Sequence, residues 1–554
     1  MILLSSLKKY QSALIITAVF AFSIFAQSVL FHYIIYHEIL FSSLWTHTGD
    51  FIRFYLPHIS IALFLASFVF LFKNKWWTVA VSVFIDVWIL ANLWYFRANN
   101  ILVDKYAIEM IGNLNGFWDS ILALIRPVDY VFIGLTIMLV GCLIITKNKS
   151  PQKVRLFIII LATSIITGLV NGAIIVHTHE NDTSYMNPFV SYDVTFESRT
   201  SFYVNDHSIN HYLIYTIIDF IKSKETPYTI TEEDSLAINK FINPSKAEHH
   251  PKTSLILCIV ESLNSFVITK EFMPNLYNMI NDDNAILFVP NIYSQEKQGN
   301  SGDGQMIIQS GLLPINKGVA CVKFPFNKYP SISSLYKKSA GLFPGSLTTW
   351  NQYLMSPAYG IDSSYVTSID DIVIAKKTIE LSKDFDNIMM LTYAMHLPCT
   401  MFSEKTTLSL PDTIPTTLSN YIKCANYTDL SLKILIDSIS QNERLKNTTI
   451  VITGDHCLPT PVDETFDNAY NYSRFIPLII YSPEIKQKTI VTDTCYQMDI
   501  YPTILHLIGC EDYYWKGFGV NLLDSTARHN RPITPEEAYN LSDKLIRANY
   551  LKRF

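Results

Sequence analysis

Residues 449–456 read Thr-Ile-Val-Ile-Thr-Gly-Asp-His, an apolar run that ends in a glycine and two metal-capable side chains. An apolar run of this length is typical of a buried strand when a turn residue follows it. The glycine allows close backbone approach at the strand end. Asp455 and His456 then offer the oxygen and nitrogen ligands that Zn²⁺ and Mn²⁺ accept. The alternative at this point is a turn with a capping Asp.

Similar apolar runs recur before and after this strand, with helical stretches between them. The other predicted strands lie at residues 255–260, 286–289, 388–393 and 477–481. The segment 421–439 has the spacing of a helix. Buried strands that alternate with helices predict an α/β domain with a largely parallel central sheet. In such sheets ligands bind beyond the carboxyl ends of the strands.

Two further strand ends carry side chains of the same chemical kind. Glu261 follows the run 255–260 directly, and His396 lies shortly after the run 388–393. Three strand ends can therefore deliver metal-capable side chains to one edge of a parallel sheet: Glu261, His396, and the pair Asp455 and His456. Taken alone, Glu261 would be interpreted as a charge at a helix N-terminus.

A glycine-rich segment holds the candidate nucleophile. Residues 298–305 read Gln-Gly-Asn-Ser-Gly-Asp-Gly-Gln and precede a helical run at 306–312. Ser301 should then lie at or just before a helix N-terminus. Free backbone N–H groups and the helix dipole favour a phosphate there. The simpler alternative is a serine N-cap in a flexible loop.

The first third of the chain has a different character. Of the 554 residues, 49% are hydrophobic and only 16% are charged, which favours a membrane portion. The candidate membrane spans lie at residues 12–36, 56–72, 76–96, 130–146 and 156–176. Since a span needs roughly 20 apolar residues, the second and fourth are at the short limit. We expect five spans, with four as the alternative, and the first to be retained as an anchor.

Basic residues predict the orientation of these spans. Lys8 and Lys9 precede the first span, Lys73 and Lys75 separate the second from the third, and a further basic cluster lies at 147–155. Such segments face the cytoplasm. With five spans, everything after His177 lies outside the cytoplasm. The sequence therefore predicts a multi-pass protein of the cytoplasmic membrane with an outer α/β domain.

Two features of the membrane region leave alternatives open. Apolar residues recur at helical spacing over 103–125, which predicts amphipathic helices that lie on the membrane surface or pack on the outer domain. Asp86 lies near the middle of the third span, where a charge is costly and often functional. A hydrogen-bonded structural role is the other interpretation.

The chain accordingly divides into four parts. They are a transmembrane domain at 1–177, a polar connector at 178–250 with a helix at 209–222, the outer domain at 251–525 and a polar tail at 526–554. The tail either packs on the domain or returns to the membrane. The net charge of −5 makes nucleic acid an unexpected partner. Seven of the eight cysteines lie after residue 177, and their spacing does not determine disulfide pairing.

Several motifs together carry a resemblance to a known family. They are Cys258-Ile259-Val260-Glu261-Ser262, Met273-Pro274-Asn275-Leu276, Gly299-Asn300-Ser301-Gly302-Asp303, Ser310-Gly311-Leu312-Leu313-Pro314, Trp350-Asn351, Met395-His396-Leu397-Pro398, Tyr427-Thr428-Asp429, Gly454-Asp455-His456 and Asp499-Ile500-Tyr501-Pro502-Thr503. In this order they resemble the lipoteichoic acid synthase branch of the alkaline phosphatase and sulfatase superfamily. The resemblance covers about residues 252–525, and spans ahead of such a domain fit the same family.

The resemblance implies a metal site and a nucleophile. One divalent cation, Mn²⁺ or Zn²⁺, would be held by Glu261, Ser301, Asp455 and His456. Ser301 stands where the family carries its threonine or serine nucleophile. A metal that lowers the pKa of a hydroxyl and neutralises phosphoryl charge suits this chemistry.

The resemblance also implies the substrates. His396 matches a histidine that meets the substrate phosphate, and Trp350 and Asn300 are expected to contact the substrate as well. The implied reaction moves a phosphoglycerol-type headgroup from a membrane phospholipid, through a covalent Ser301 intermediate, to a glycan, glycolipid or polymer acceptor.

The sequence departs from the family at the headgroup pocket. The family's tryptophan has a histidine and an acidic residue before it and an arginine after it, whereas residues 343–352 here read Phe-Pro-Gly-Ser-Leu-Thr-Thr-Trp-Asn-Gln. A pocket of Phe343, Trp350 and Gln352 should recognise a different headgroup or bind the headgroup loosely. The alternatives are a phosphoethanolamine transferase, a hydrolase of phosphate or sulfate esters, and a catalytically silent membrane receptor or assembly protein.

Overall fold

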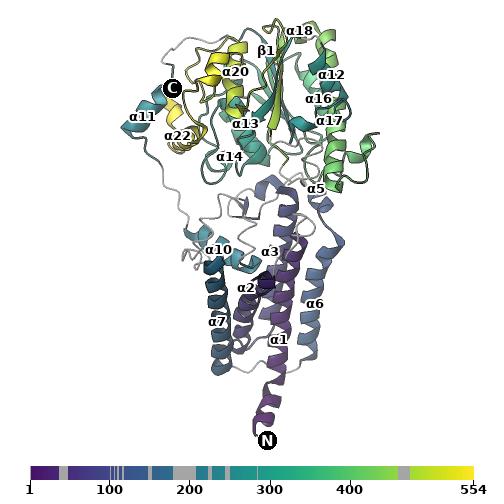
Figure 1. Cartoon of the computed structure of the whole chain (residues 1–554), viewed down its shortest axis with the longest axis vertical. Helices are drawn as coiled ribbons and strands as arrows, with labels where there is room; N and C mark the ends of the chain where they lie inside the picture. The colour runs from purple at the N-terminus through teal and green to yellow at the C-terminus, as the bar shows by residue number, and fades with distance from the viewer. Residues whose placement is uncertain are drawn as a thin grey trace. The chain divides into compact units, whose positions relative to one another are not determined.

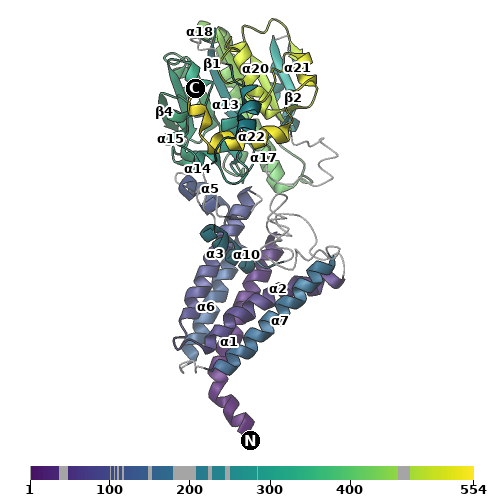
Figure 2. The same cartoon turned by 90° about the vertical axis from the view of Figure 1, so that its left-hand side faces the viewer.

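A computed structural model gives the structure of the chain (Figures 1 and 2). The residues that it describes are 2–35, 48–99, 102–104, 107–108, 111–114, 118–146, 153–178, 207–222, 228–243, 250–282, 285–458 and 475–553. They form two compact units. The first joins Met1–Lys105 with Leu124–Lys224, and the second joins Tyr106–Ala123 with Glu225–Phe554. Each unit is described by itself.

The first unit is a bundle of long apolar helices (Figure 2). Its main helices are α1 (Ile2–Ile34), α2 (Thr48–Ser67), α3 (Trp77–Asn99), α6 (Tyr130–Ile145) and α7 (Val154–Thr178). Among the described residues, four segments are long and apolar enough to cross a membrane: Gln11–Ile34, Trp77–Ala98, Pro127–Ile145 and Val154–Val176. The apolar part of α2, Phe54–Phe70, is shorter. The chain is thus a membrane protein, and a fifth span stays a prediction.

Polar side chains tie the helices of this unit together. Ser60 on α2 and Ser164 on α7 each donate a hydrogen bond to the other's backbone carbonyl, at 3.1 and 2.8 Å. Small hydroxyl residues at such a crossing let two helices approach closely. The expected helix at 209–222 is present as α10 (Ile209–Lys222), and the Trp88 indole of α3 donates to the Ile209 carbonyl at 3.1 Å. Most of the remaining connector, and residues 147–152 of the basic cluster, lie outside the described residues.

The second unit contains one mixed, mostly parallel sheet in the order β4-β3-β5-β1-β6-β7-β2-β8, with β9 beside β2. Its strands are β1 (Ser254–Val260), β2 (Ile286–Tyr293), β3 (Ser339–Pro344), β4 (Ser363–Thr367), β5 (Asn387–Leu391), β6 (Thr448–Gly454), β7 (Phe475–Tyr481), β8 (Thr489–Ile490) and β9 (Cys495–Tyr496). Neighbours from β4 to β6 pair in parallel, while β7 runs antiparallel to β6 and β2. The predicted fold class is confirmed.

Helices cover both faces of this sheet (Figure 1). Leu255, Leu257 and Ile259 of β1 pack with α13 (Asn300–Ser310), α20 (Ile500–Leu507) and α22 (Pro535–Arg547). The alternate β1 residues Ile256, Cys258 and Val260 pack with α12 (Pro274–Asn281), α16 (Asp371–Leu381) and α17 (Thr416–Gln441). Because side chains alternate along a strand, a strand covered on both faces is apolar throughout.

Two segments that the sequence left open belong to the second unit. The described parts of residues 106–123 group with it, and Ala107 packs on its core, although Met110 and Phe117 of the expected amphipathic pattern lie outside the described residues. The residues after 525 also pack here: Ser542 of α22 donates to the Leu313 carbonyl at 2.6 Å. The Tyr539 hydroxyl donates to the Gln295 carbonyl, and Lys297 lies 4.3 Å above the Tyr539 ring. All eight cysteines are free thiols.

Candidate active site

The register of two central strands brings the candidate ligands together. Val260 at the end of β1 pairs with Gly454 at the end of β6. Glu261 follows the first strand, and Asp455 and His456 follow the second. One ligand atom from each of these three residues lies within 4.8 Å of the others, and all three side chains are buried. The predicted convergence at the carboxyl edge of the sheet is therefore present in the geometry.

Ser301 faces this cluster from the first turn of α13. Its Oγ lies 3.2 Å from Glu261 Oε2 and 3.3 Å from His456 Nε2. His456 Nε2 is in turn 3.5 Å from Glu261 Oε1 and 3.6 Å from Asp455 Oδ2. The four side chains thus enclose one point with oxygen and nitrogen atoms, a donor set that suits Zn²⁺ or Mn²⁺.

Surrounding groups fix the orientation of these side chains. His456 Nδ1 donates to the Cys457 carbonyl at 2.8 Å, which leaves Nε2 to face the cluster. Asp455 Oδ1 accepts the backbone N–H groups of Ser262 and His456, both at 2.8 Å. The Ser262 hydroxyl donates to Glu261 Oε1 at 2.9 Å. Each carboxylate keeps its other oxygen for the centre of the cluster.

The electrostatics of the cluster favour a bound cation. Burial and the nearby Glu261 charge raise the pKa of Asp455 to about 7. Burial lowers the pKa of His456, but the charges of Asp455 and Glu261 outweigh it and raise that pKa to about 9. Burial likewise opposes ionisation of Glu261, and the charges of His456 and His396 still lower its pKa. Two adjacent buried carboxylates repel each other, and a divalent cation offsets that repulsion.

A glycine allows α13, the helix that carries Ser301, to approach the loop of Asp455 and His456 closely. A Cβ on Gly304 would overlap the backbone of Asp455, so a larger residue would push α13 away. Asp303 holds the turn before the helix, because its Oδ2 accepts the backbone N–H groups of Lys297 and Gly299 at 3.0 and 2.9 Å. Asn300 has a φ of 38°, which the local turn imposes on an asparagine.

His396 lies on the loop after β5, half-buried. Its Nδ1 bonds to the Leu397 carbonyl at 2.7 Å, and its ring stacks on Tyr393 at 5.0 Å between centroids. Asp371 supports this loop by accepting the N–H groups of Tyr393 and Ala394, at 2.7 and 3.1 Å. The loop therefore presents Nε2 of His396 near the cluster, close enough for its charge to lower the pKa of Glu261.

Trp350 is partly buried against the core and lies beside the segment that carries Ser301. A Cβ on Gly302 would meet its ring at 3.0 Å, so the indole packs over the residue after Ser301. The expectation that Phe343 and Gln352 line the same pocket was wrong. Phe343 is 1% exposed within β3, a strand that is buried along its length. Gln352 is buried too, and its amide donates to Gln305 at 2.7 Å.

Sequence reasoning assigned no role to three residues that support the site. Asp303 lies within the glycine-rich motif, whereas Asp371 and Gln497 lie outside the sequence motifs. Gln497 donates to the Asp455 carbonyl at 2.7 Å from the segment before α20. A buried Asp directly after a helix start signal, such as Asp370-Asp371, was the available hint. Gln497 carried no local signal, because its role depends on a contact with a residue 42 positions away.

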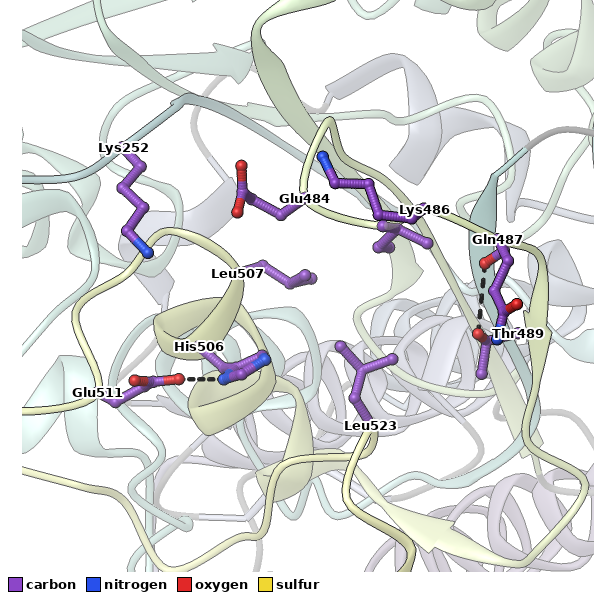
Figure 3. A pocket seen from close by; sticks show the side chains of 10 residues that line it. Lys252, Glu484, Lys486, Gln487, Thr489, His506, Leu507, Glu511 and Leu523 are labelled. Atoms are coloured by element: carbon purple, nitrogen blue, oxygen red, sulfur yellow. Dashed lines mark hydrogen bonds and ion pairs between the residues drawn. The ribbon is translucent and has the colours of Figure 1, made fainter.

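A separate pocket of about 250 Å³ lies elsewhere on the second unit (Figure 3). It is lined by polar residues that include Lys252, Glu484, His506 and Glu511, and the last two form an ion pair. Lys252 precedes β1, whereas Glu261 follows it, so the pocket is at the opposite strand end from the cluster. We assign the chemistry to the cluster.

Comparisons with known proteins indicate the family to which the chain is similar. Residues 4–226 match the family model "Lipoteichoic acid synthase N-terminal domain", and residues 321–510 match the model "Sulfatase". Lipoteichoic acid synthase 2 of Bacillus subtilis is 24% identical over 87% of this chain and 80% of its own length. Lipoteichoic acid synthase of Staphylococcus aureus is 23% identical over 86% of this chain and 79% of its own length.

One solved structure covers both units. It is the integral membrane protein lipooligosaccharide phosphoethanolamine transferase A of Neisseria meningitidis, with a TM-score of 0.53. It is 14% identical, and the match covers 89% of this chain and 95% of that protein. At this identity the likeness concerns the fold: a membrane helix region joined to a domain of the same type.

Proposed function

Because the chain is a phosphotransferase of the lipoteichoic acid synthase-like branch of the alkaline phosphatase and sulfatase superfamily, we propose that Ser301 carries the transferred group. The proposed reaction moves a phospho-headgroup, of the phosphoglycerol type, from a membrane phospholipid to an acceptor hydroxyl outside the cytoplasm. The observation that carries this proposal is the position of Ser301 Oγ, 3.2 Å from Glu261 and 3.3 Å from His456.

We further propose that Glu261, Ser301, Asp455 and His456 hold one divalent cation, Mn²⁺ or Zn²⁺. Two buried carboxylates without a neutralising metal are costly, which supports this assignment. When bound, the cation would supply charge neutralisation for the phosphoryl oxygens and for an ionised Ser301. The residues of the chain then orient the substrate and move protons.

In the first step the Ser301 oxygen attacks the headgroup phosphorus. Its proton leaves, and the Glu261 carboxylate is the acceptor to which the hydroxyl already donates. The phosphorus–oxygen bond to diacylglycerol breaks as the new bond forms. Protonated His396 can give the proton that the leaving diacylglycerol oxygen requires. The product is a phospho-headgroup ester on Ser301.

In the second step an acceptor hydroxyl attacks the same phosphorus. His396, now neutral, has its proton on Nδ1 because that atom donates to the Leu397 carbonyl. Its Nε2 can therefore take the proton of the attacking hydroxyl. The Ser301 oxygen leaves and regains a proton, so atoms and charge balance over the cycle. The acceptor is a glycan, a glycolipid or a growing polymer.

The headgroup is bounded by Trp350 and Asn300. Both lie next to Ser301 in the chain or in space, which supports a role in substrate binding. The polar clamp of the family is missing from residues 343–352, and Phe343 and Gln352 are buried, so Trp350 is the main aromatic wall. Phosphoethanolamine is the alternative headgroup, since residues 343–352 offer no side chain that recognises the glycerol hydroxyls.

The experiment that tests the proposal is mass spectrometry of the Ser301 peptide. Protein purified from its native membrane should carry a phosphoglycerol adduct at Ser301, or a phosphoethanolamine adduct if that headgroup is used. The Ser301→Ala protein is the control and should carry neither. An unmodified Ser301 peptide in metal-loaded protein supplied with phospholipid, with turnover still present, would contradict the covalent scheme.

A further inference from the structure

Three helices of the first unit share a polar contact in their apolar interior. Gln27 of α1 donates to Asp86 Oδ1 of α3 at 2.5 Å, and Thr136 of α6 donates to Asp86 Oδ2 at 2.7 Å. Gln27 and Thr136 also meet, at 3.4 Å. In the described part of the chain the Asp86 carboxylate thus has two neutral donors and no basic partner.

Two serines lie one helical turn from this contact. Ser23 precedes Gln27 by four residues on α1, and Ser82 precedes Asp86 by four residues on α3, so each shares a helix face with its neighbour. The two helices run in parallel register, because Phe20 meets Trp77 at 5.4 Å between ring centroids and Gln27 meets Asp86. Ser23 and Ser82 therefore lie at the same level of the bundle.

Three oxygen atoms of this group have no hydrogen-bond partner. They are Ser23 Oγ, Gln27 Oε1 and Ser82 Oγ, and all three residues are 0% exposed. Other buried hydroxyls of the unit have partners: Thr17 donates to the Ala13 carbonyl of its own helix at 2.8 Å, and Ser60 donates to the Ser164 carbonyl of another helix at 3.1 Å. An unpartnered buried polar atom is costly, more so in a membrane interior. A missing partner that accepts several oxygens at once would remove this cost.

We propose that Ser23, Gln27, Ser82, Asp86 and Thr136 form a binding site for one monovalent cation, with Na⁺ as its probe. The donors are all oxygen atoms: a carboxylate, an amide oxygen and three hydroxyls, which are hard ligands suited to a hard ion. One negative charge matches one positive charge, so the loaded site is neutral inside the membrane. The orphan oxygens and the carboxylate that lacks a basic partner are independent observations that point to the same ligand.

Thermal unfolding of the full-length protein in lipid nanodiscs tests the site without using its enzyme activity. Wild-type protein should unfold at a temperature higher by about 3 °C or more in NaCl than in choline chloride of equal concentration, because an ion that binds only the folded state stabilises it. The Ser23→Ala, Ser82→Ala double variant should lose this shift. It should keep the wild-type unfolding temperature in choline chloride, since it removes only unpartnered hydroxyls.

Ser67→Ala is the matched control. Ser67 is also buried in the first unit, but its hydroxyl donates to the Phe64 carbonyl at 2.7 Å, so this variant should keep the Na⁺ shift. Two results overturn the proposal: a wild-type unfolding temperature that does not differ between the two salts, and a double alanine variant that still responds to Na⁺. The first result would mean that the site binds no Na⁺. The second would mean that the Na⁺ effect arises elsewhere in the protein.

Discussion

Gly304 lies against the backbone of Asp455, so closely that any side chain at position 304 would overlap it. This contact joins the helix that carries Ser301 to the loop that carries two candidate metal ligands. We expect Gly304→Ala to reduce headgroup transfer by about 100-fold or more, since a shift of about 1 Å can cost that much in a catalytic site. The measurement is steady-state transfer by the purified full-length protein.

Gly141→Ala is the control for that substitution. Gly141 is a helical glycine whose added Cβ would meet nothing within 4 Å, so activity should stay at the wild-type level. A Gly304→Ala protein with full turnover would show that the approach of α13 to Asp455 does not position Ser301.

A substitution at Ser301 should affect headgroup transfer without removing the bound metal ion. Ser301→Ala should abolish transfer yet keep a bound cation, because Glu261, Asp455 and His456 still supply three ligands. Asp455→Asn should weaken metal binding by at least about tenfold and lose transfer as well. Equilibrium dialysis with elemental analysis gives both affinities. If Ser301→Ala protein kept its activity, another nucleophile would have to be sought.

Trp350 should govern donor binding. Trp350→Ala removes the aromatic wall over Gly302, and we expect KM for the phospholipid donor to rise by roughly tenfold with a smaller effect on kcat. Tyr353→Ala is a control from the neighbouring helix, since Tyr353 is half exposed. Equal losses of kcat in both variants would instead indicate a general disturbance of this segment.

Asp371 should give the protein a pH-dependent stability. Burial raises its pKa to about 6 from an ordinary 3.8, so the folded state binds a proton more tightly than the unfolded state. This contribution, roughly 3 kcal/mol, is present below about pH 4 and lost as pH rises to about 6. Asp371→Asn should flatten the dependence of the unfolding temperature on pH over this window. An unchanged slope in Asp371→Asn would refute the assignment.

Arg531 should be a main support of the second unit. Both of its terminal nitrogens donate to Asp499 at 2.7 Å, and Asp499 is fully buried. Arg531→Ala leaves the buried carboxylate without its cationic partner, so we expect a loss of about 3 to 5 kcal/mol in unfolding free energy. Arg444→Ala breaks an exposed pair with Asp386 and should cost less than about 1 kcal/mol. Similar unfolding temperatures for the two variants would contradict this ranking.

The strands that sequence predicted are those that are apolar on both faces. β1 after Ser254 and the central Ile-Val-Ile of β6 are apolar, and both strands are buried in the middle of the sheet. β4 was missed because it reads Ser-Ser-Tyr-Val-Thr at the sheet edge and is mostly half-buried. β3 was missed because its glycine and proline lower strand propensity, and its burial comes from neighbours far away in the sequence.

The sequence predicted those site residues that directly follow a recognisable strand or start a recognisable helix. Glu261, Asp455 and His456 follow predicted strands, and Ser301 lies at the start of a predicted helix. Asp371 and Gln497 could not be found in this way, because each supports the site through contacts made only after folding. Phe343 was misjudged for the same reason: it lies within β3, whose burial comes from neighbours far away in the sequence.

Helix α22 contacts the chain on both sides of Ser301. Tyr539 of α22 bonds to Gln295, Ser542 bonds to Leu313, and these two positions flank Ser301 on either side. A chain without α22 would therefore lose contacts on both sides of Ser301, so this helix is part of the support of the candidate site and not a separate tail.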